Sequence, residues 1–312
     1  MRYGLPYKGS KNAIARQIVS QLPEAEIFVD LFFGGGAVTH AAMLMDKYER
    51  FIINDIDGRL PKLFVECAHG MHTIKNHPEW ISREEFNSKK SDDAYIALVW
   101  SFGNNGIDYI YGSEIEEYKH DFHRAVFENK PEMLRKYGIH LNLSPCEEAL
   151  KRYHDYSVQI KRFLAESKTR KYDLENFERL QALERLESLY RLQSLQSLQS
   201  LQSHYEDVPI PTNALIYCDP PYNSTNCGKY KGFDSNRFYE WAEKQDNIFI
   251  SEYEMPEPFI PIWQTEKTVL SAANTNLKTV EKLYTNQRTW KSLSEEQKRK
   301  YKLYFVEQLS FF

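Results

Sequence analysis

Short apolar runs and helix-forming stretches alternate along the first sixty residues. The run at residues 27–32 predicts a buried strand, and residues 51–53 predict a second one. Three consecutive glycines follow the first run, and residues 37–48 predict a helix between the two strands. Strand, glycine turn, helix, strand is the opening of a doubly wound α/β domain, so we expect a Rossmann-like fold.

The same pattern returns near the C-terminus, after a long helical middle. Residues 214–218 and 247–251 predict strands, and segments near 268–270 and 280–284 would complete the sheet. Helical patterning covers much of the middle, including residues 92–100 and 114–129, and Ser10 is the expected N-cap of a first helix over residues 11–22. We therefore expect one α/β domain, residues 1–60 and 206–312, interrupted by a mainly helical insertion at residues 61–205.

A leucine repeat marks the end of the insertion, with leucine at every third position from 180 to 201. Because an α-helix has 3.6 residues per turn, this stripe drifts by about 60° per triplet and loses a coiled-coil seam. Three interpretations stay open: a helix buried on shifting faces, a segment that self-associates into an oligomer, or a low-complexity expansion. We expect a helical spacer within the insertion.

Composition narrows the class of protein. The 312 residues carry a net charge of −4, which argues against a purely electrostatic DNA binder. Residues 119–171 nevertheless hold twelve Lys or Arg against seven Asp or Glu, and residues 281–312 hold seven against four. Each run is either a solvated helix face or a track for phosphates, and residues 151–171 are our candidate for phosphate contacts.

The sequence predicts a protein of a reducing cytoplasm. It contains no stretch of about 18 apolar residues that would span a membrane. Its N-terminus lacks the apolar core of a signal peptide. The four cysteines form no Cys-x-x-Cys pair, so neither a structural zinc site nor a disulfide framework is expected.

The strongest chemical signal is Asp219-Pro220-Pro221-Tyr222, directly after a predicted strand. Two prolines end the strand and fix the backbone, which holds the acid at the carboxyl end of the sheet, where α/β domains bind ligands. The alternative is a strand-ending turn with an exposed acid and a packed tyrosine.

A second signal is the glycine loop after the first strand, with Phe32, Gly34 and Gly36. Glycines allow close approach of a ligand to the backbone, and Asp55 ends the next strand, where an acid commonly binds a ribose. The loop lacks a full G-x-G-x-x-G, because Thr39 stands at the last glycine position, and it lacks a Walker lysine. This shifts weight from NAD and ATP toward other nucleotide-type ligands, with a turn acid as the alternative for Asp55.

A third signal precedes the first helix, where Tyr7 and Lys11 flank a glycine turn. They could present a ring and a cation to a carboxylate-bearing ligand. In order and content, the three segments resemble the Dam-type DNA adenine methyltransferases. Residues 100–106 resemble the Asn-Gly segment of that family, although residues 107–109 lack the arginine that often follows it.

The resemblance implies a site-specific enzyme that transfers a methyl group from S-adenosylmethionine to the N6 amino group of a flipped-out adenine in double-stranded DNA. It implies a bacterial or phage-encoded protein with no metal, and it leaves open a restriction partner. The insertion would be the target-recognition domain. The implied catalytic residues are Asp219, Pro220, Pro221 and Tyr222. The implied cofactor contacts are Tyr7, Lys11, Phe32, Gly34, Gly36, Asp55 and Asp219.

Two rival functions stay open. The first is methylation of another amino group, such as cytosine N4, an RNA base or a glutamine amide, where Ser or Asn often stands in place of Asp219. The second is a catalytically silent scaffold assembled through the leucine repeat. Separately, the tail Gln308-Leu309-Ser310-Phe311-Phe312 resembles peptides that dock on the replication sliding clamp, or it is a tail folded on the domain.

Overall fold

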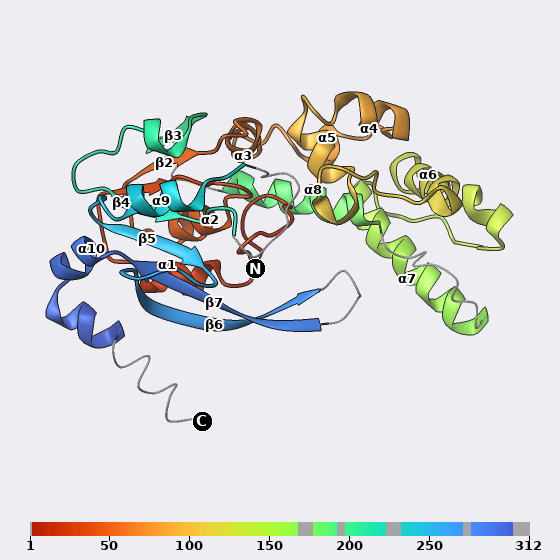
Figure 1. Cartoon of the computed structure of the whole chain (residues 1–312). Helices are drawn as coiled ribbons and strands as arrows, with labels where there is room; N and C mark the ends of the chain where they lie inside the picture. The colour runs from red at the N-terminus through yellow and green to blue at the C-terminus, as the bar shows by residue number, and fades with distance from the viewer. Residues whose placement is uncertain (1, 168–176, 192–196, 223–231, 271–275, 302–312) are drawn as a thin grey trace. The chain divides into compact units, whose positions relative to one another are not determined.

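The computed structural model describes residues 2–167, 177–191, 197–222, 232–270 and 276–301, and these form two compact units (Figure 1). The sheet unit contains Lys11–Pro61 and Gln193–Phe312, and the helical unit contains Arg2–Ser10 and Lys62–Leu192. The chain passes from one to the other within α3 (Arg59–Ala68). Residues 2–10 lie in the helical unit and residues 198–201 in the sheet unit, and the predicted division into a catalytic domain and a target-recognition insertion stays a prediction.

The sheet unit is built on a seven-stranded sheet of order β3-β2-β1-β4-β5-β7-β6. The strands are β1 (Ile27–Asp30), β2 (Arg50–Asn54), β3 (Leu198–Leu201), β4 (Leu215–Cys218), β5 (Ile248–Glu252), β6 (Ile260–Leu270) and β7 (Asn276–Thr285). Neighbours from β3 to β5 are parallel, whereas β7 runs antiparallel to both β5 and β6. This confirms the predicted α/β class with a mostly parallel, Rossmann-like sheet.

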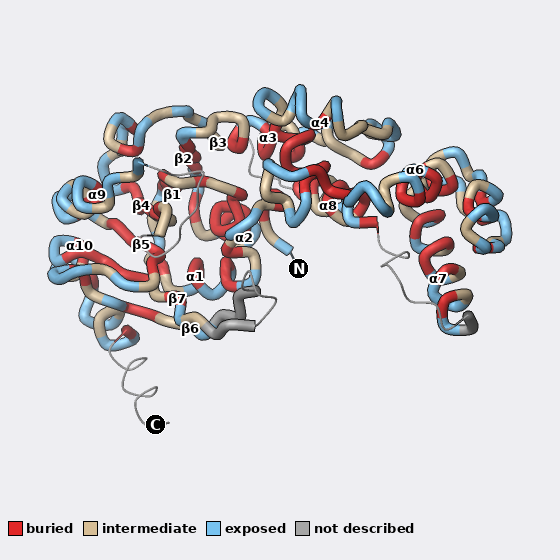
Figure 2. The backbone as a smooth tube through the Cα atoms, turned by 45° about the vertical axis from the view of Figure 1, so that its right-hand side comes forward, coloured by how far each residue is buried: buried red, intermediate tan, exposed pale blue. Residues whose placement is uncertain are grey.

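Helices cover both faces of the sheet, and the central strands are buried throughout (Figure 2). On one face, Val29 and Ile216 pack in a cluster with Phe238 and Ala242 of α9 (Ser235–Ala242). On the other face, α2 (Ala37–Leu44) sends Thr39 to the carboxyl group of Asp30. Next to α2 lies α1 (Ala15–Gln21), and α10 (Gln287–Ser292) follows β7. Such two-sided burial explains why the parallel strands are continuous apolar runs.

The last part of the leucine repeat corrects our expectation of a helical spacer. Its beginning is helical, in α8 (Glu178–Glu187) and the short 3-10 helix η4 (Ser188–Arg191), but β3 is a strand of the sheet. Phe51 of β2 stands in register with Leu198, and Asn54 with Leu201. The backbone of β2 would otherwise form an open sheet edge, so pairing overrides the helix propensity of Leu and Gln.

The first predicted helix is also corrected at its start. Helix α1 begins at Ala15, and Ile14 occupies the N-cap position without a side-chain cap. Ser10 instead lies in a turn in which its N–H donates to the carbonyl of Tyr7 over 3.2 Å. A further turn follows, in which the N–H of Ile14 donates to the carbonyl of Lys11 over 2.9 Å, and Ile14 has non-helical dihedrals of φ −121° and ψ 0°, so the regular helix starts only at Ala15.

The helical unit is organised around a buried arginine. Its α-helices are α4 (Arg83–Lys89), α5 (Ala94–Val99), α6 (Ser113–Glu128), α7 (Ala149–Ser167) and α8. Further 3-10 helices are η1 (Ile74–Asn76), η2 (Phe102–Asn104) and η3 (Pro131–Tyr137), with η6 (Tyr205–Asp207) in the sheet unit. The guanidinium of Arg179 lies 4.4 Å from the ring centroid of Trp100 and 2.9 Å from Nδ1 of His123. This cation–π and hydrogen-bonded core explains how Arg179 can be fully buried.

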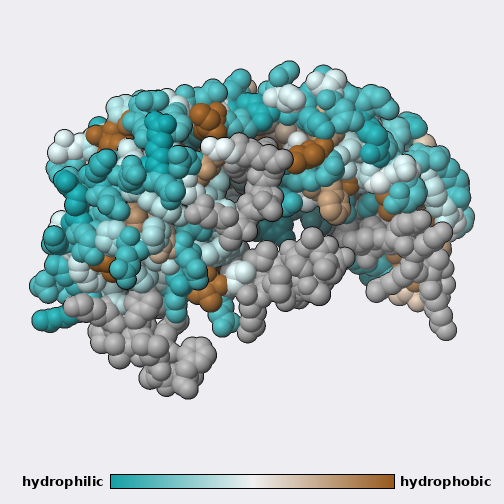
Figure 3. Space-filling view, in the orientation of Figure 1, coloured by the Kyte–Doolittle hydropathy of each residue, from teal (hydrophilic) through white to brown (hydrophobic). Residues whose placement is uncertain are grey.

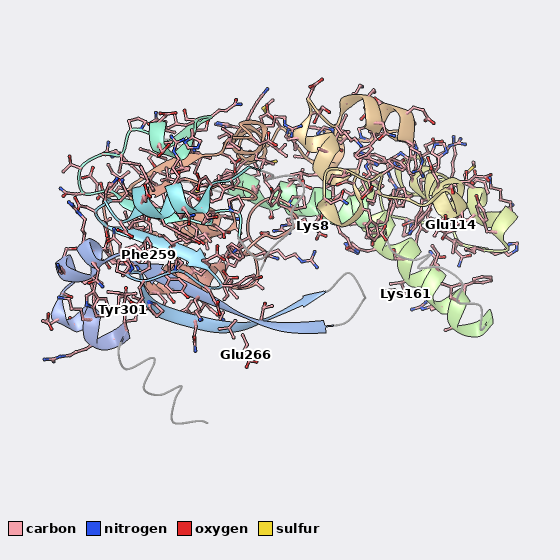
Figure 4. All side chains as sticks on the ribbon, in the orientation of Figure 1. Lys8, Glu114, Lys161, Phe259, Glu266 and Tyr301 are labelled. Carbon is pink, nitrogen blue, oxygen red and sulfur yellow. The ribbon has the colours of Figure 1, made fainter. Side chains whose placement is uncertain are left out.

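The basic run at residues 151–171 is only partly available for phosphates. Arg152 is buried and donates to the carbonyls of Val126 and Phe127. Lys151 pairs with Glu148 over 2.6 Å. Lys161, labelled in Figure 4, and Arg162 are exposed on α7, whereas residues 168–171 lie outside the described residues.

The protein surface seen in Figure 3 is mostly hydrophilic, with small separate apolar patches. Within the described ranges, no helix has the length and apolar character needed to cross a membrane. Cys67, Cys146 and Cys218 carry free thiols, and Cys218 is buried in the core of the sheet unit.

Candidate active site

The predicted site residues of the sheet unit gather where the strand order reverses. Strand β1 lies between β2 and β4, and the chain leaves each of these parallel strands at the same edge of the sheet. The glycine loop follows β1, Asp55 follows β2 and Asp219 follows β4. Open α/β sheets bind ligands outside the carboxyl ends of strands at such a reversal.

The glycine loop is shaped by two left-handed residues. Gly34 has φ 49° and Gly36 has φ 65°, and Gly36 is the N-cap of α2. A Cβ atom on Gly36 would lie 2.1 Å from the ring of Phe33, so both the backbone and the packing require glycine. The turn leaves the N-terminal N–H groups of α2 at the loop, an arrangement that suits polar ligand atoms.

Asp55 ties this loop to the next strand. One carboxylate oxygen accepts the N–H of Gly34 over 2.7 Å, and the other accepts the N–H of Asp57 over 2.9 Å. Asp55 therefore does stabilise turns, which was the alternative role that the sequence left open. A carboxylate has about four lone-pair sites, so Asp55 can still accept hydrogen bonds from a ribose.

Phe32 and Asp30 flank the loop on opposite faces of the sheet. The half-buried ring of Phe32 stands edge-on to Phe238, with 5.5 Å between the centroids. Asp30 is buried and accepts the hydroxyl of Thr39 over 2.6 Å. Burial raises the pKa of the Asp30 carboxyl to about 7. The site thus contains, beside the glycine turn, a carboxyl group that titrates near neutral pH.

Lys11 contacts Asp219 at the end of β4, although the two residues are 208 positions apart in the sequence. Its Nζ donates to Oδ1 of Asp219 over 2.7 Å, and the Lys11 side chain is only 5% exposed. Asp219 remains 22% exposed, and Pro220 is buried against the strand end. The structure therefore brings together two predicted residues that the sequence could not pair.

Glu281 of β7 completes this cluster. Its Oε1 accepts the hydroxyl of Tyr222 and lies 3.6 Å from Nζ of Lys11. The ammonium of Lys11 also lies 4.5 Å from the ring centroid of Tyr222. Tyr253 packs edge-on against the same ring, with 4.6 Å between the centroids. We call Lys11, Asp219, Tyr222 and Glu281 the charge cluster.

Electrostatics keeps the cluster charged and its hydroxyl protonated. Burial alone would lower the pKa of Lys11, but Asp219 and Glu281 together hold that pKa above its usual value. Burial raises the pKa of the Tyr222 hydroxyl far above its usual range, and the two carboxylates raise it further. The Tyr222 hydroxyl therefore stays protonated and donates a hydrogen bond to Glu281. The cluster as a whole contains two carboxylates and one ammonium.

Glu281 was missed from the sequence, although one signal could have found it. Residues 281, 283 and 285 of β7 are fully buried, and alternate positions of a strand share one face. A glutamate on that inward face departs from the apolar pattern. Such a charge needs a buried partner, and here Lys11 supplies one.

Tyr7 is the one predicted site residue that belongs to the helical unit, in the segment Arg2–Ser10. Within that unit, Arg185 donates to the carbonyls of Tyr3 and Gly4, and Lys8 donates its N–H to Asn104 over 3.3 Å. The role of Tyr7 toward a cofactor stays a prediction.

The family model of the D12 class N6 adenine-specific DNA methyltransferases matches residues 7–302, nearly the whole chain. The chain belongs to this family. No curated protein sequence matches it. This methyltransferase therefore acts on adenine N6 in DNA and uses S-adenosylmethionine, which confirms the predicted enzyme class, substrate and cofactor.

The residues of this D12 methyltransferase fit that cofactor. The positive-φ glycine turn and Asp55 are suited to an adenosyl group. Asp219 and Glu281 with Lys11 leave one net negative charge, which complements a sulfonium cation.

Proposed function

We propose that this methyltransferase holds a flipped-out adenine at the charge cluster and methylates it there. The observation that carries the proposal is the contact of Lys11 with Asp219 at the carboxyl end of β4, beside the ring of Tyr222. An adenine inside a duplex hides its amino group, so the base must leave the stack before it can react. Tyr222 then offers an aromatic face for stacking.

Asp219 and the Pro220 carbonyl supply the two acceptors that the amino group needs. The N6 lone pair is delocalised into the ring, which makes the nitrogen a poor nucleophile. If Asp219 accepts one N6 hydrogen and the Pro220 carbonyl accepts the other, the nitrogen becomes more tetrahedral and its lone pair is aimed at the methyl donor. When bound, S-adenosylmethionine supplies an electrophilic methyl group. The residues act by positioning and electrostatics.

The cofactor would lie along the loop after β1. Gly34 and Gly36 allow close approach of the adenosyl group, and Phe32 borders the loop with its ring. Asp55 would accept the ribose hydroxyls. Tyr7 and Lys11 are proposed for the amino-acid end of the cofactor. The Lys11 ammonium already contacts Asp219, so one cation would serve both halves of the site.

A loop of the helical unit is our candidate for base contacts. Ser101 and Tyr109 form an isolated β-bridge, and the Oδ1 atom of Asn105 accepts the N–H groups of Ile107 and Asp108. The loop exposes two apolar side chains, Phe102 at 69% and Ile107 at 54%. Apolar wedges of this kind unstack base steps, and Lys161 and Arg162 would contact phosphates.

Two further expectations concern the C-terminal tail and the leucine repeat. The tail at residues 308–312 lies outside the described residues, and its docking on a sliding clamp stays a proposal. Deleting these five residues should abolish clamp binding and leave methylation of a short duplex intact. Clamp binding that survives the deletion would refute the idea. In the described part of the repeat, Leu180, Leu183 and Leu186 are buried within this chain, so we do not propose oligomerisation through it.

The proposal is tested by Asp219→Ala. Modification-sensitive sequencing of DNA from cells that express the chain should find N6-methyladenine in one short motif. The variant should lower the methylation rate at least about 100-fold, because a preorganised polar contact at the reacting group is lost. Asp246→Ala, which removes an exposed carboxylate paired with Arg288, is the matched control and should keep full activity.

If Asp219→Ala keeps the parent rate, the assignment of Asp219 fails. If the parent binds S-adenosylmethionine but modifies no adenine, assays on cytosine N4, RNA and protein amides separate the rival substrates. A parent that binds no S-adenosylmethionine would favour the silent scaffold.

A further inference from the structure

We propose that Glu281 is a positioning residue, whose carboxylate locks the Tyr222 ring and the Lys11 ammonium in one arrangement beside Asp219. The inference rests on the proposed role of Tyr222 and Asp219. It adds a residue that touches neither base nor cofactor in the proposed mechanism and acts through these two side chains.

Three contacts form a closed triangle. The Tyr222 hydroxyl donates to Oε1 of Glu281, the same oxygen lies 3.6 Å from Nζ of Lys11, and that Nζ lies 4.5 Å from the Tyr222 ring centroid. Each member is therefore held by the other two. The loop that carries Tyr222 follows β4, and Lys11 precedes α1, so neither is fixed by a regular element of its own.

Glu281 itself sits on a rigid support. It lies within β7, whose register is Glu281 to Thr265 of β6, and its neighbours Leu283 and Thr285 on the same face are fully buried. The Glu281 side chain is 0% exposed, so it has little freedom to choose another rotamer. Glu281, held by a strand, thus fixes the positions of two residues from less regular segments.

A buried second carboxylate is difficult to explain by the Lys11–Asp219 pair alone. One carboxylate would neutralise Lys11, and a further buried negative charge carries a desolvation penalty. This penalty is reduced because Glu281 accepts the Tyr222 hydroxyl and also lies 3.6 Å from the Lys11 ammonium. The arrangement also orients the Tyr222 ring through its hydroxyl, because a phenol held at its tip loses its remaining torsional freedom.

The experiment compares Glu281→Ala, Glu281→Gln, Tyr222→Phe and the double variant Glu281→Ala/Tyr222→Phe. The substrate is plasmid DNA free of N6-methyladenine, and the probe is S-adenosylmethionine with a tritiated methyl group. Single-turnover rates are measured at saturating DNA and cofactor, and the Kd of the cofactor is measured by calorimetry. Glu266→Gln, on the neighbouring strand β6 and labelled in Figure 4, removes an exposed carboxylate as the matched control.

We expect Glu281→Ala to lower the single-turnover rate by about 10- to 100-fold, as expected for loss of a hydrogen bond to a charged group. Glu281→Gln keeps an acceptor for the Tyr222 hydroxyl and should recover part of that loss. Tyr222→Phe should be slower than the parent, and adding it to Glu281→Ala should cost little more, because both remove the same contact. The cofactor Kd should change less than about threefold in every variant, and Glu266→Gln should match the parent.

Full activity of Glu281→Ala would overturn the proposal, and so would rate losses for Glu281→Ala and Tyr222→Phe that simply multiply. Urea unfolding supplies a readout without catalysis: the midpoints of the double variant and of Glu281→Ala should coincide, and additive shifts would again refute the contact. If Glu281→Ala does not fold, Glu281→Gln takes its place: the loss caused by Tyr222→Phe should be smaller in the Glu281→Gln background than in the parent, because a neutral amide is a weaker acceptor than a carboxylate, and an unchanged loss would refute the contact. A parent that methylates no adenine would refute the proposed function, whereas the unfolding cycle would still judge the contact.

Discussion

The two halves of the site, at the ends of β1 and β4, are formed by different groups: mainly backbone in one and charged side chains in the other. Beyond β1, the glycine loop is shaped by backbone: two left-handed glycines, and the Asp55 carboxylate bound to the N–H groups of Gly34 and Asp57. Beyond β4, the charge cluster is shaped by side chains, through the contacts of Lys11 and Glu281. The glycine-loop half thus provides a backbone surface that a ligand can approach, and the charge cluster provides an electrostatic field.

This difference matches the two tasks that we propose for the two halves. A cofactor with many polar atoms is held by N–H groups and a ribose-binding acid, which need shape but little net charge. An amino group that must become more nucleophilic needs fixed acceptors, and these work best when their own charges are compensated. With a pKa of about 7, Asp30 is partly protonated at neutral pH and adds less than a full negative charge beside Asp55.

The largest effect should follow Lys11→Met, which removes the only cation of the charge cluster as defined above. Asp219 and Glu281 then face each other without compensation, and breaking a buried pair in this way costs about 3 kcal/mol in unfolding free energy. Urea unfolding measures the loss, and methylation should fall with it. Lys8→Met is the control, because the Lys8 side chain is exposed and should change stability by less than about 0.5 kcal/mol. Equal stability of Lys11→Met and the parent would show that the cluster carries no stabilising charge pair.

A smaller effect is expected at the glycine loop, from Gly36→Ala. A left-handed alanine costs about 1 kcal/mol, and its Cβ would force the buried Phe33 ring to move, which adds about 1 kcal/mol. Because α2 starts at this residue, we also expect about tenfold weaker binding of S-adenosylmethionine by calorimetry. Gly138→Ala has the same backbone strain with open space around its Cβ, so it isolates the strain. If both variants lose the same stability and bind the cofactor equally, the Phe33 contact is irrelevant.

The sequence sufficed for the elements that are locally consistent. The apolar runs of β1, β2, β4 and β5 were predicted because strands buried on both faces have no polar alternation to obscure them. The strand β3 was not, since Leu-Gln-Ser triplets favour a helix and only the edge of β2 makes them extended. Propensity is local, whereas an open sheet edge is a property of the assembled fold.

The site divides in the same way. The motifs located Asp219 and Gly36 because ligand loops follow strand ends, a rule that the chain order reveals. Glu281 was invisible to that rule, because its partners Lys11 and Tyr222 are 270 and 59 residues away. Only the antiparallel pairing of β7 with β5 brings it there.

The smallest effect, and the sharpest contrast between the halves, should come from the pH dependence of stability at Asp30. Burial raises its pKa from 3.8 in the unfolded chain to about 7 in the folded protein. The folded protein thus binds this proton more tightly, so the contribution to stability is complete below about pH 4 and is lost as the pH rises through about 7. Asp30→Asn removes the titration while its amide oxygen can still accept the Thr39 hydroxyl.

Between pH 5 and pH 7, without cofactor, the unfolding free energy of the parent should therefore fall relative to Asp30→Asn by about 1 kcal/mol or more. Urea unfolding at several pH values measures the difference, and Asp46→Asn at an exposed position is the control that should stay parallel to the parent. Parallel curves for Asp30→Asn and the parent would mean that Asp30 is ionised in the folded protein. The glycine-loop half would then carry a second buried negative charge besides Asp55, and the electrostatic difference between the two halves would shrink.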